Sequence, residues 1–436
     1  MSIRGIGRRP ARTWWVALAA LSIFLVTEWQ TPSSAQTTRS EKVVLYAAAG
    51  PELIQYEVDT ANASLTRRGS VTLPANVQEG WVHPSKPILY LTWSNRGPDG
   101  GQPGAGAHGL TAFVVDRASG ALRQHGPTVP LAARSIHMTT DIPGEHVLVA
   151  YNEPPGLTVH RIQADGTLGS DVKPTSPLTL GIYPHFVRVD PSNRSAIVVS
   201  RGNNPTSAKP ADPGSINVFS YKNGVLANLG SVAPGGGFGF QSRHIDFHPS
   251  RPWVFLTLER QNKLQVFQKS ADGMLSAMPV FSKDTLIAPG SARPGQSTAS
   301  IHMHPNGRFL YLSNRAGGTT PFEGRPVFAG GENSIAVYRV NQDTGEPTLI
   351  QNADTHGFTP RTFGIDPAGR LLVVANQSAM AVREGSSVRT VPAGLSVFRI
   401  QEDGKLQYVR KYDVDVGASK SLFWMVLVPL RPGGVE

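Results

Sequence analysis

The stretch Met303-His-Pro-Asn-Gly-Arg-Phe-Leu-Tyr-Leu-Ser-Asn-Arg315 contains a tight turn followed by an apolar strand that ends in polar residues. Proline presets the φ angle of such a turn, and the nearby glycine tolerates the positive φ that closes it. The same phrase recurs at Trp81-Val-His-Pro84, Ile142-Pro143-Gly144, Val189-Asp-Pro191, Phe247-His-Pro249 and Ile365-Asp-Pro367. The chain is therefore predicted to be built from a repeated unit.

A second phrase, an alternating strand followed by a glycine turn, occurs seven times, starting near residues 53, 110, 157, 216, 264, 335 and 395. Alternation with a period of two indicates strands with one buried face. The two phrases together supply four short strands per unit, so seven units predict an all-β fold, a seven-bladed β-propeller of four-stranded antiparallel blades. The last strand, Ser421-Leu-Phe-Trp-Met-Val-Leu-Val428, has no partner of its own and is predicted to complete the first blade, which begins with Val43-Val-Leu-Tyr46.

The composition fits a turn-rich β protein. The 436 residues include 45 Gly and 35 Pro, with 40% hydrophobic and only 17% charged residues. This excludes a highly charged disordered chain and a coiled coil. Because the chain has no cysteine, disulfides, zinc–thiolate sites and cysteine nucleophiles are also excluded.

The first 35 residues are typical of a secretory signal. Basic residues precede an almost unbroken apolar run from Trp14 to Val26, and the small residues Ser33 and Ala35 follow. The run is shorter than the roughly 20 residues of a membrane span. We expect cleavage near Ala35 and a periplasmic or secreted location. A short linker over 36–42, the propeller over 43–428 and a tail over 429–436 would follow.

The charge balance argues against a nucleic-acid partner. Cleavage of the signal takes four arginines and one glutamate from 41 basic and 31 acidic residues, which leaves an excess of seven positive charges. No run of Lys or Arg is longer than two residues, so nucleic-acid binding is not predicted. The stretches rich in Gly, Pro and polar residues at 97–109, 201–215, 234–240, 288–300 and 316–332 are expected to be loops, on the face where a propeller usually carries its site.

Counting from the turn prolines predicts a ring of polar residues at one mouth of the central channel. The strand before each proline lines the channel and the next strand runs back, so position −6 and position +10 lie at the same end. Position −6 holds His137, His185, Arg243, Ala299 and Arg361, and position +10 holds Glu153, Arg201, Glu259, Arg315 and Gln377. The unit around Pro84 is expected not to keep this register. Charged groups in a partly closed channel are costly unless they are paired or used, which favours a functional ring.

The sequence resembles the β-propeller lactonase family, which includes one type of 6-phosphogluconolactonase and the fungal-type 3-carboxy-cis,cis-muconate lactonizing enzyme. The resemblance covers roughly residues 41–428 and rests on Ser242-Arg-His-Ile-Asp-Phe-His-Pro249 with Leu258-Glu259, on the stretch 303–315, and on Pro360-Arg-Thr-Phe-Gly-Ile-Asp-Pro-Ala-Gly-Arg370 with Asn376-Gln377. It implies functional roles for His185, Arg243, Glu259 and Arg315. The segment Ser200-Arg-Gly-Asn-Asn204 departs from the family, where an Asp-rich turn is found.

The expected reaction is hydrolysis of a sugar lactone such as gluconolactone. Either Glu259 or His185 would be the base that activates water, and Arg243 and Arg315 would stabilise the oxyanion. The substrate-binding set would be Arg201, Arg361, His137, Gln377 and Glu153. No cofactor and no metal site are expected. A cycloisomerase of the 3-carboxymuconate type and a non-catalytic ligand- or protein-binding propeller are the alternatives.

Overall fold

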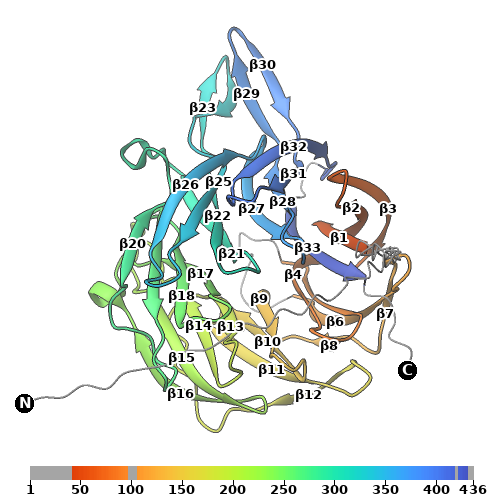
Figure 1. Ribbon diagram of the computed structural model, residues 1–436, viewed down its shortest axis with the longest axis vertical. Coiled ribbons are helices and arrows are strands. Elements are labelled where there is room, and N and C mark those ends of the chain that lie inside the picture. The colour runs from red at the N-terminus through yellow and green to blue at the C-terminus, as the bar shows by residue number, and fades with distance from the viewer. Residues whose placement is uncertain (1–41, 97–105, 418–420, 431–436) are drawn as a thin grey trace, which may run out of the picture. The chain divides into compact units, whose positions relative to one another are not determined.

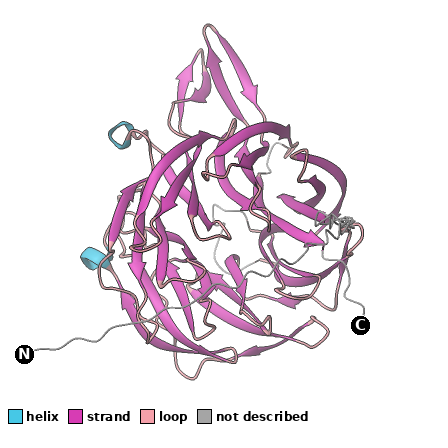
Figure 2. Cartoon of the chain, in the orientation of Figure 1, coloured by secondary structure: helices cyan, strands magenta, loops and turns pink. Residues whose placement is uncertain are grey.

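The computed structural model describes residues 42–96, 106–417 and 421–430. The predicted signal and its cleavage near Ala35 lie outside the described residues. The described chain is almost wholly β-structure, with two 3₁₀ turns at Pro234–Gly237 and Pro289–Ser291 (Figure 2). No helix among the described residues is long and apolar enough to cross a membrane.

Seven antiparallel sheets form the blades, which we number 1 to 7 along the chain, with the strands of each blade named from the innermost outward. Blade 1 contains β33 (Leu422–Leu430), β1 (Lys42–Ala49), β2 (Glu52–Asp59) and β3 (Ser64–Thr72). Blade 2 contains β4 (Asn76–Val82), β5 (Ile88–Ser94), β6 (His108–Val115) and β7 (Leu122–Gln124), with β8 (Val129–Pro130) also paired to β6. Blade 3 contains β9 (Ser135–Thr140), β10 (His146–Tyr151), β11 (Gly156–Ile162) and β12 (Leu168–Val172).

The remaining blades repeat this order. Blade 4 contains β13 (Pro184–Val189), β14 (Ser195–Ser200), β15 (Ser215–Lys222) and β16 (Val225–Val232). Blade 5 contains β17 (Ser242–Phe247), β18 (Trp253–Leu258), β19 (Lys263–Gln268) and β20 (Phe281–Asp284). Blade 6 contains β21 (Ser297–Met303), β22 (Phe309–Arg315), β25 (Ser334–Val340) and β26 (Pro347–Asp354). Blade 7 contains β27 (Phe358–Ile365), β28 (Leu371–Ser378), β31 (Gly394–Ile400) and β32 (Leu406–Asp413).

The blades form a closed ring around a central channel. The innermost strands contact one another in the order β33, β4, β9, β13, β17, β21, β27 and back to β33, and Figure 1 shows them nearest the centre. Seven hydrophobic clusters fill the ring, one between each pair of neighbouring blades. The seven-bladed propeller predicted from the repeated phrases is therefore confirmed.

The closing strand is also confirmed. β33 pairs antiparallel with β1, from Lys42 opposite Leu430 to Ala49 opposite Leu422. Its buried side chains enter two clusters, because Met425 packs toward blade 7 while Trp424 packs toward blade 2. The strand runs two residues beyond the predicted boundary at Val428. Pairing of these two distant strands covers the sheet edge at the seam of the ring.

Two hairpins were not predicted from the sequence. β23 (Thr319–Phe322) pairs with β24 (Arg325–Phe328) inside the stretch expected to be a loop at 316–332. β29 (Met380–Glu384) pairs with β30 (Ser387–Val391), which no sequence signal indicated. The hairpins pack together through β24 and β29, and Figure 1 shows them projecting beyond the blades. The predicted loop at 97–109 lies mostly outside the described residues.

Candidate active site

Every innermost strand contains a β-bulge near its start, where two residues face one on the second strand. The register with the second strand slips at the same place in all seven blades. In blades 4 and 7 the extra residues are His185 and Arg361, and in blade 5 Arg243 and His244 share Thr257 as their opposite residue. A bulge releases a side chain from the regular alternation and turns it. Three of the predicted residues, His185, Arg243 and Arg361, therefore occupy equivalent positions around the channel.

Glu259 is the centre of the charged cluster. It follows the last residue of β18, and its backbone N–H donates to the Gln241 carbonyl at 2.9 Å. Arg201 Nη1 lies 3.2 Å from Glu259 Oε2, and Arg243 Nε lies 3.5 Å from Glu259 Oε1. Arg315 also donates to Oε1 through Nη2. One carboxylate thus binds arginines from three successive blades, 4, 5 and 6.

The arginines are also held from behind. Arg201 stacks on the Tyr183 ring at 4.1 Å, and Arg315 Nε donates to Ser297 Oγ at 3.0 Å. Arg361 stacks on Phe423 of the closing strand, again at 4.1 Å. Guanidinium groups favour such planar stacking because they are weakly hydrated and delocalised. These contacts fix the direction of the donors before any ligand arrives.

Arg243 is the most deeply buried residue of this group, with an exposed fraction of 0%. Its Nε and Nη1 atoms have no hydrogen-bond partner among the described residues. Burial, reinforced by Arg315, lowers the pKa of this guanidinium well below its usual value. Since arginine stays protonated in proteins, this shift indicates that the site favours an incoming anion or a developing oxyanion.

The two candidate bases have different environments. Burial alone would raise the pKa of Glu259, but Arg315, Arg243 and Arg201 outweigh it and lower the pKa to about 2. Burial and the nearby arginines, Arg243 first, lower the pKa of His185 well below its usual value. His185 is therefore a neutral imidazole at pH 7, and its Nδ1 has no hydrogen-bond partner in the described part of the chain. Glu259 is ionised, but both of its oxygens already bind arginines.

Two residues predicted for this ring, His137 and Glu153, lie away from the charged cluster. In blade 3 the sequence reads Asp141-Ile-Pro143, so the proline comes one residue later than in the other blades. Counting from Pro143 therefore gives His137 where the bulged residue is Ile136. The same shift gives Glu153, which is exposed, in place of the buried Asn152. His137 instead lies one step deeper, in the channel.

Two other positions in the count also have a definite place. Gln377 lies near the end of β28 and donates to Ser421 Oγ at 3.4 Å, so it adjoins the start of the closing strand. The unit around Pro84 keeps the register after all, because Gln78 occupies its bulge. Arg134, which the count did not reach, donates to Gln78 Oε1 at 2.7 Å and is buried. Its only sequence signal is its place just before a channel strand.

Below the bulges the channel contains a cavity of about 260 Å³. Its wall includes Glu79, Trp81, His137, His244 and His302. The His244 ring centroid lies 5.4 Å from that of His185 and 5.8 Å from that of His137. The His244 ring therefore lies between the cavity and His185 at the charged mouth.

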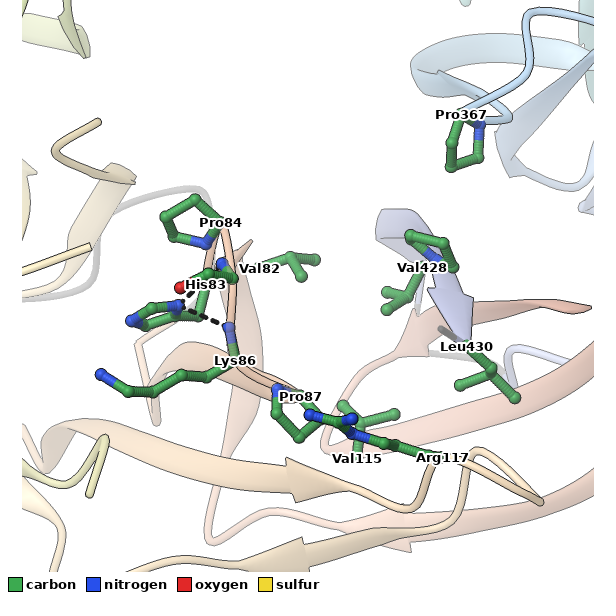
Figure 3. A pocket seen from close by; sticks show the side chains of 12 residues that line it. Val82, His83, Pro84, Lys86, Pro87, Val115, Arg117, Pro367, Val428 and Leu430 are labelled. Atoms are coloured by element: carbon green, nitrogen blue, oxygen red, sulfur yellow. Dashed lines mark hydrogen bonds between the residues drawn. The ribbon is translucent and has the colours of Figure 1, made fainter. Parts of the chain in front are cut away.

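A separate pocket of about 300 Å³ lies at the other end of the strands, between blades 1 and 2 (Figure 3). Its wall is mostly apolar, with Val82, Val115, Val428 and Leu430, and Lys86 is one of its few charged groups. The His83 side chain in this wall accepts hydrogen bonds from its own turn. The described residues that line this pocket do not combine a base with an oxyanion donor, so it is not the candidate active site.

Among the described residues, one group has ligand atoms close enough to hold a metal ion, namely Asp141, Glu145 and His146. Asp141 already accepts from the backbone N–H of Glu145 and from His146 Nδ1, at 2.7 and 2.8 Å. It also accepts from Tyr221 of the next blade at 2.8 Å. The Asp141 oxygens are therefore used to hold their own turn together and to link blade 3 to blade 4.

Comparison with known families adds a second line of evidence to this geometry. The family described as a lactonase with a seven-bladed β-propeller matches residues 37–384. The chain belongs to the β-propeller lactonase family. This lactonase is 26% identical over 338 residues to the 6-phosphogluconolactonase of Bacillus subtilis, covering 76% of this chain and 86% of the relative. It is 27% identical over 385 residues to that of Pectobacterium carotovorum, covering 86% and 96%.

A solved structure shows the same fold. The periplasmic gluconolactonase of Pseudomonas aeruginosa superposes with a TM-score of 0.66 at 19% identity, covering 90% of this chain and 100% of that one. At this identity the likeness concerns the fold. The enzyme class follows from the family, and the lactonase is a hydrolase.

Proposed function

We propose that this protein is an exported lactonase that hydrolyses a sugar lactone such as gluconolactone at the mouth formed by blades 4 to 7. The observation that carries the proposal is the triple arginine contact of Glu259 beside the neutral His185. Lactone hydrolysis needs a water nucleophile, a base and fixed positive charge for the oxyanion. The mouth offers the base and the positive charge within one cluster.

His185 is the base in this proposal. It accepts a proton from the attacking water while the new C–O bond forms at the lactone carbonyl. Glu259 is the weaker candidate because its carboxylate oxygens are already engaged by Arg201, Arg243 and Arg315. Its role is to position the arginines.

Arg243 and Arg315 receive the oxyanion. Among the described residues nothing hydrogen-bonds to Arg243 Nη1, so this atom can donate to the oxyanion, while Arg315 is oriented by Ser297. A guanidinium binds paired oxygens through parallel hydrogen bonds, so Arg201 and Arg361 suit the hydroxyls of the substrate or the carboxylate of the product. Water exclusion strengthens each of these charges.

Export would place the enzyme outside the cytoplasm, away from the phosphorylated sugar lactones made inside the cell. An exported enzyme therefore favours an unphosphorylated sugar lactone as substrate. The support for export is the basic and apolar pattern over residues 1–35. N-terminal sequencing of the protein from a periplasmic fraction tests this part. A mature start near residue 36 is expected, and a protein that begins at Met1 or Ser2 would overturn it.

A panel of lactones measured by pH-stat tests the activity. Acid release from glucono-1,5-lactone above the spontaneous rate supports the proposal, and a strong preference for the 6-phospho compound corrects the substrate. An ultraviolet change with 3-carboxymuconate indicates the cycloisomerase. No reaction with any of them indicates a binding protein. The variant Arg243→Ala should lose the activity on the lactone that the wild type hydrolyses. Its matched control is Arg188→Ala, because Arg188 lines the same channel but pairs with Asp246 at 3.3 Å.

A further inference from the structure

A second carboxyl group, Glu79, is half-buried and faces the channel on β4 of blade 2. It directly follows the bulged Gln78, and its side chain lines the channel cavity together with His137 and His244. The proposed hydrolysis assigns no role to it. No repeat position marks it, since the other blades carry residues such as Phe186 and Thr362 at this place.

Glu79 shares its arginines with Glu259. The charges of Arg361 and Arg243 act on the Glu79 carboxyl, and the same two arginines interact with Glu259. Trp424 of the closing strand donates a hydrogen bond to Glu79, and the Gly80 N–H donates to Oε1 at 3.3 Å. The charges of Arg361 and Arg243 thus act on both carboxyl groups.

The environments of the two carboxyl groups differ. Glu259 binds its three arginines directly and is ionised. Around Glu79, burial dominates over the Gly80 N–H and the Arg361 charge and raises the pKa to about 8. The other titratable groups that line its cavity are His137 on β9, His244 on β17, Arg188 on β13 and His302 on β21. Burial lowers the pKa of each of these three histidines, so they stay neutral and do not help Glu79 to ionise.

A carboxyl group whose pKa is raised towards the working pH can keep its proton and donate it to a leaving group. We propose that Glu79 is the general acid of this lactonase and donates its proton to the ring oxygen that leaves the carbonyl carbon. The inference rests on the proposed lactone hydrolysis and adds a catalytic residue to it.

Atoms and protons balance over one turnover. His185 takes one proton from water while the water oxygen bonds to the carbonyl carbon. The bond between that carbon and the ring oxygen then breaks, and the Glu79 proton completes the new hydroxyl group. The proton on His185 returns to Glu79 by way of water. The product acid ionises, so each turnover releases one proton.

The test compares two lactones that differ in their leaving group. An alkoxide, as in glucono-1,5-lactone, needs a proton to leave, whereas a phenolic lactone such as dihydrocoumarin releases an oxygen of pKa about 10 that needs little help. Glu79→Gln keeps the shape and the hydrogen bonds to Gly80 and Trp424. We expect it to lower kcat for gluconolactone by about 10²-fold, as general acids typically contribute. Hydrolysis of the phenolic lactone should change by less than about threefold, since its leaving group needs little acid catalysis.

The second readout is the pH profile of kcat for gluconolactone. In the wild type, kcat should fall above about pH 8 as Glu79 ionises. This fall at high pH, the alkaline limb of the profile, should be absent in Glu79→Gln. His302→Gln, in the same cavity, is the matched control and should keep both the ratio of the two lactones and the limb. Equal losses on both lactones, or no loss, would overturn the inference while leaving the proposed function in place. A wild type inactive on both lactones would overturn the proposed function as well.

Discussion

The two ends of the innermost strands carry polar side chains in different states of pairing. At the turn end, the histidines before the prolines are fully engaged. His83, His248 and His304 each donate from Nε2 to a glycine carbonyl of the next blade, at 3.0, 3.1 and 2.9 Å. At the bulge end, His185 and Arg243 keep buried nitrogen atoms without hydrogen-bond partners among the described residues.

The difference separates stability from chemistry along a single strand. A buried polar group that finds no partner costs free energy, so a protein retains it only where something else requires it. The paired histidines join blades 2 to 3, 5 to 6 and 6 to 7 and hold the ring together. Substitutions of the paired histidines at the turn end should therefore change stability, and substitutions of the unpaired His185 and Arg243 at the bulge end should change activity.

The largest effect is expected from a deletion that removes both ends of one strand. A chain that stops at Lys420 lacks β33, which pairs with β1 and fills two hydrophobic clusters. It should show no cooperative unfolding transition in calorimetry. A chain that stops at Leu430 keeps β33 and is the control. A cooperative transition in the shorter chain would show that the seam is dispensable.

Arg243→Ala should lower kcat for the lactone substrate by about 10²–10³-fold, the usual cost of one oxyanion donor. The fold should survive, since the substitution removes a buried cation whose nitrogen atoms are only partly paired by the described residues. Steady-state kinetics and a thermal melt measure the two quantities. If the melting temperature collapsed while the surviving protein kept its rate, the bulge end would be structural.

Glu259→Gln should destabilise the fold by about 3–5 kcal/mol at pH 7, because buried arginines lose their counter-charge. The Glu259 pKa of about 2 lies below the ordinary 4.5, so this carboxylate stabilises the fold above pH 4.5. The contribution is lost as the pH falls from 4.5 towards 2. Urea unfolding at about pH 7 and about pH 3 should show the gap between variant and wild type shrinking. A gap independent of pH would contradict the ionised state of Glu259.

His304→Ala should cost about 1–3 kcal/mol of stability and leave kcat unchanged, since it breaks the bond to Gly369 and leaves that carbonyl unpaired. His304→Asp is a matched variant, because Asp190 and Asp366 occupy the same position in blades 4 and 7. It should keep the local turn and lose the link to blade 7. Denaturant unfolding and lactone kinetics check both variants. A large loss of kcat in a stable His304→Ala protein would erase the contrast between the two ends.

The sequence predicted the ring because the proline turns recur with the same chemistry in each blade. Pro143 comes one residue later in its turn than the other prolines do, so the count from it selected His137 and Glu153 in place of Ile136 and Asn152. A shift of one residue matters because side chains alternate along a strand. The hairpin β29–β30 produced no signal, because its polar strands pair mainly with each other and pack on β24. Glu79 and Arg134 lie outside the counted positions. Only the closed ring brings them close to Arg361.

The seven bulges also have a consequence for variation. A bulged residue does not take part in the hydrogen-bonded ladder, so its identity is only weakly tied to strand formation. Replacing one of the polar bulged residues changes a functional group at the mouth while the pairing of the strand stays the same. Each of the seven blades has one such position, so substitutions at these positions can change the substrate preference of the mouth one blade at a time. The positions are Gln78, Ile136, His185, Arg243, Ala299, Arg361 and Phe423.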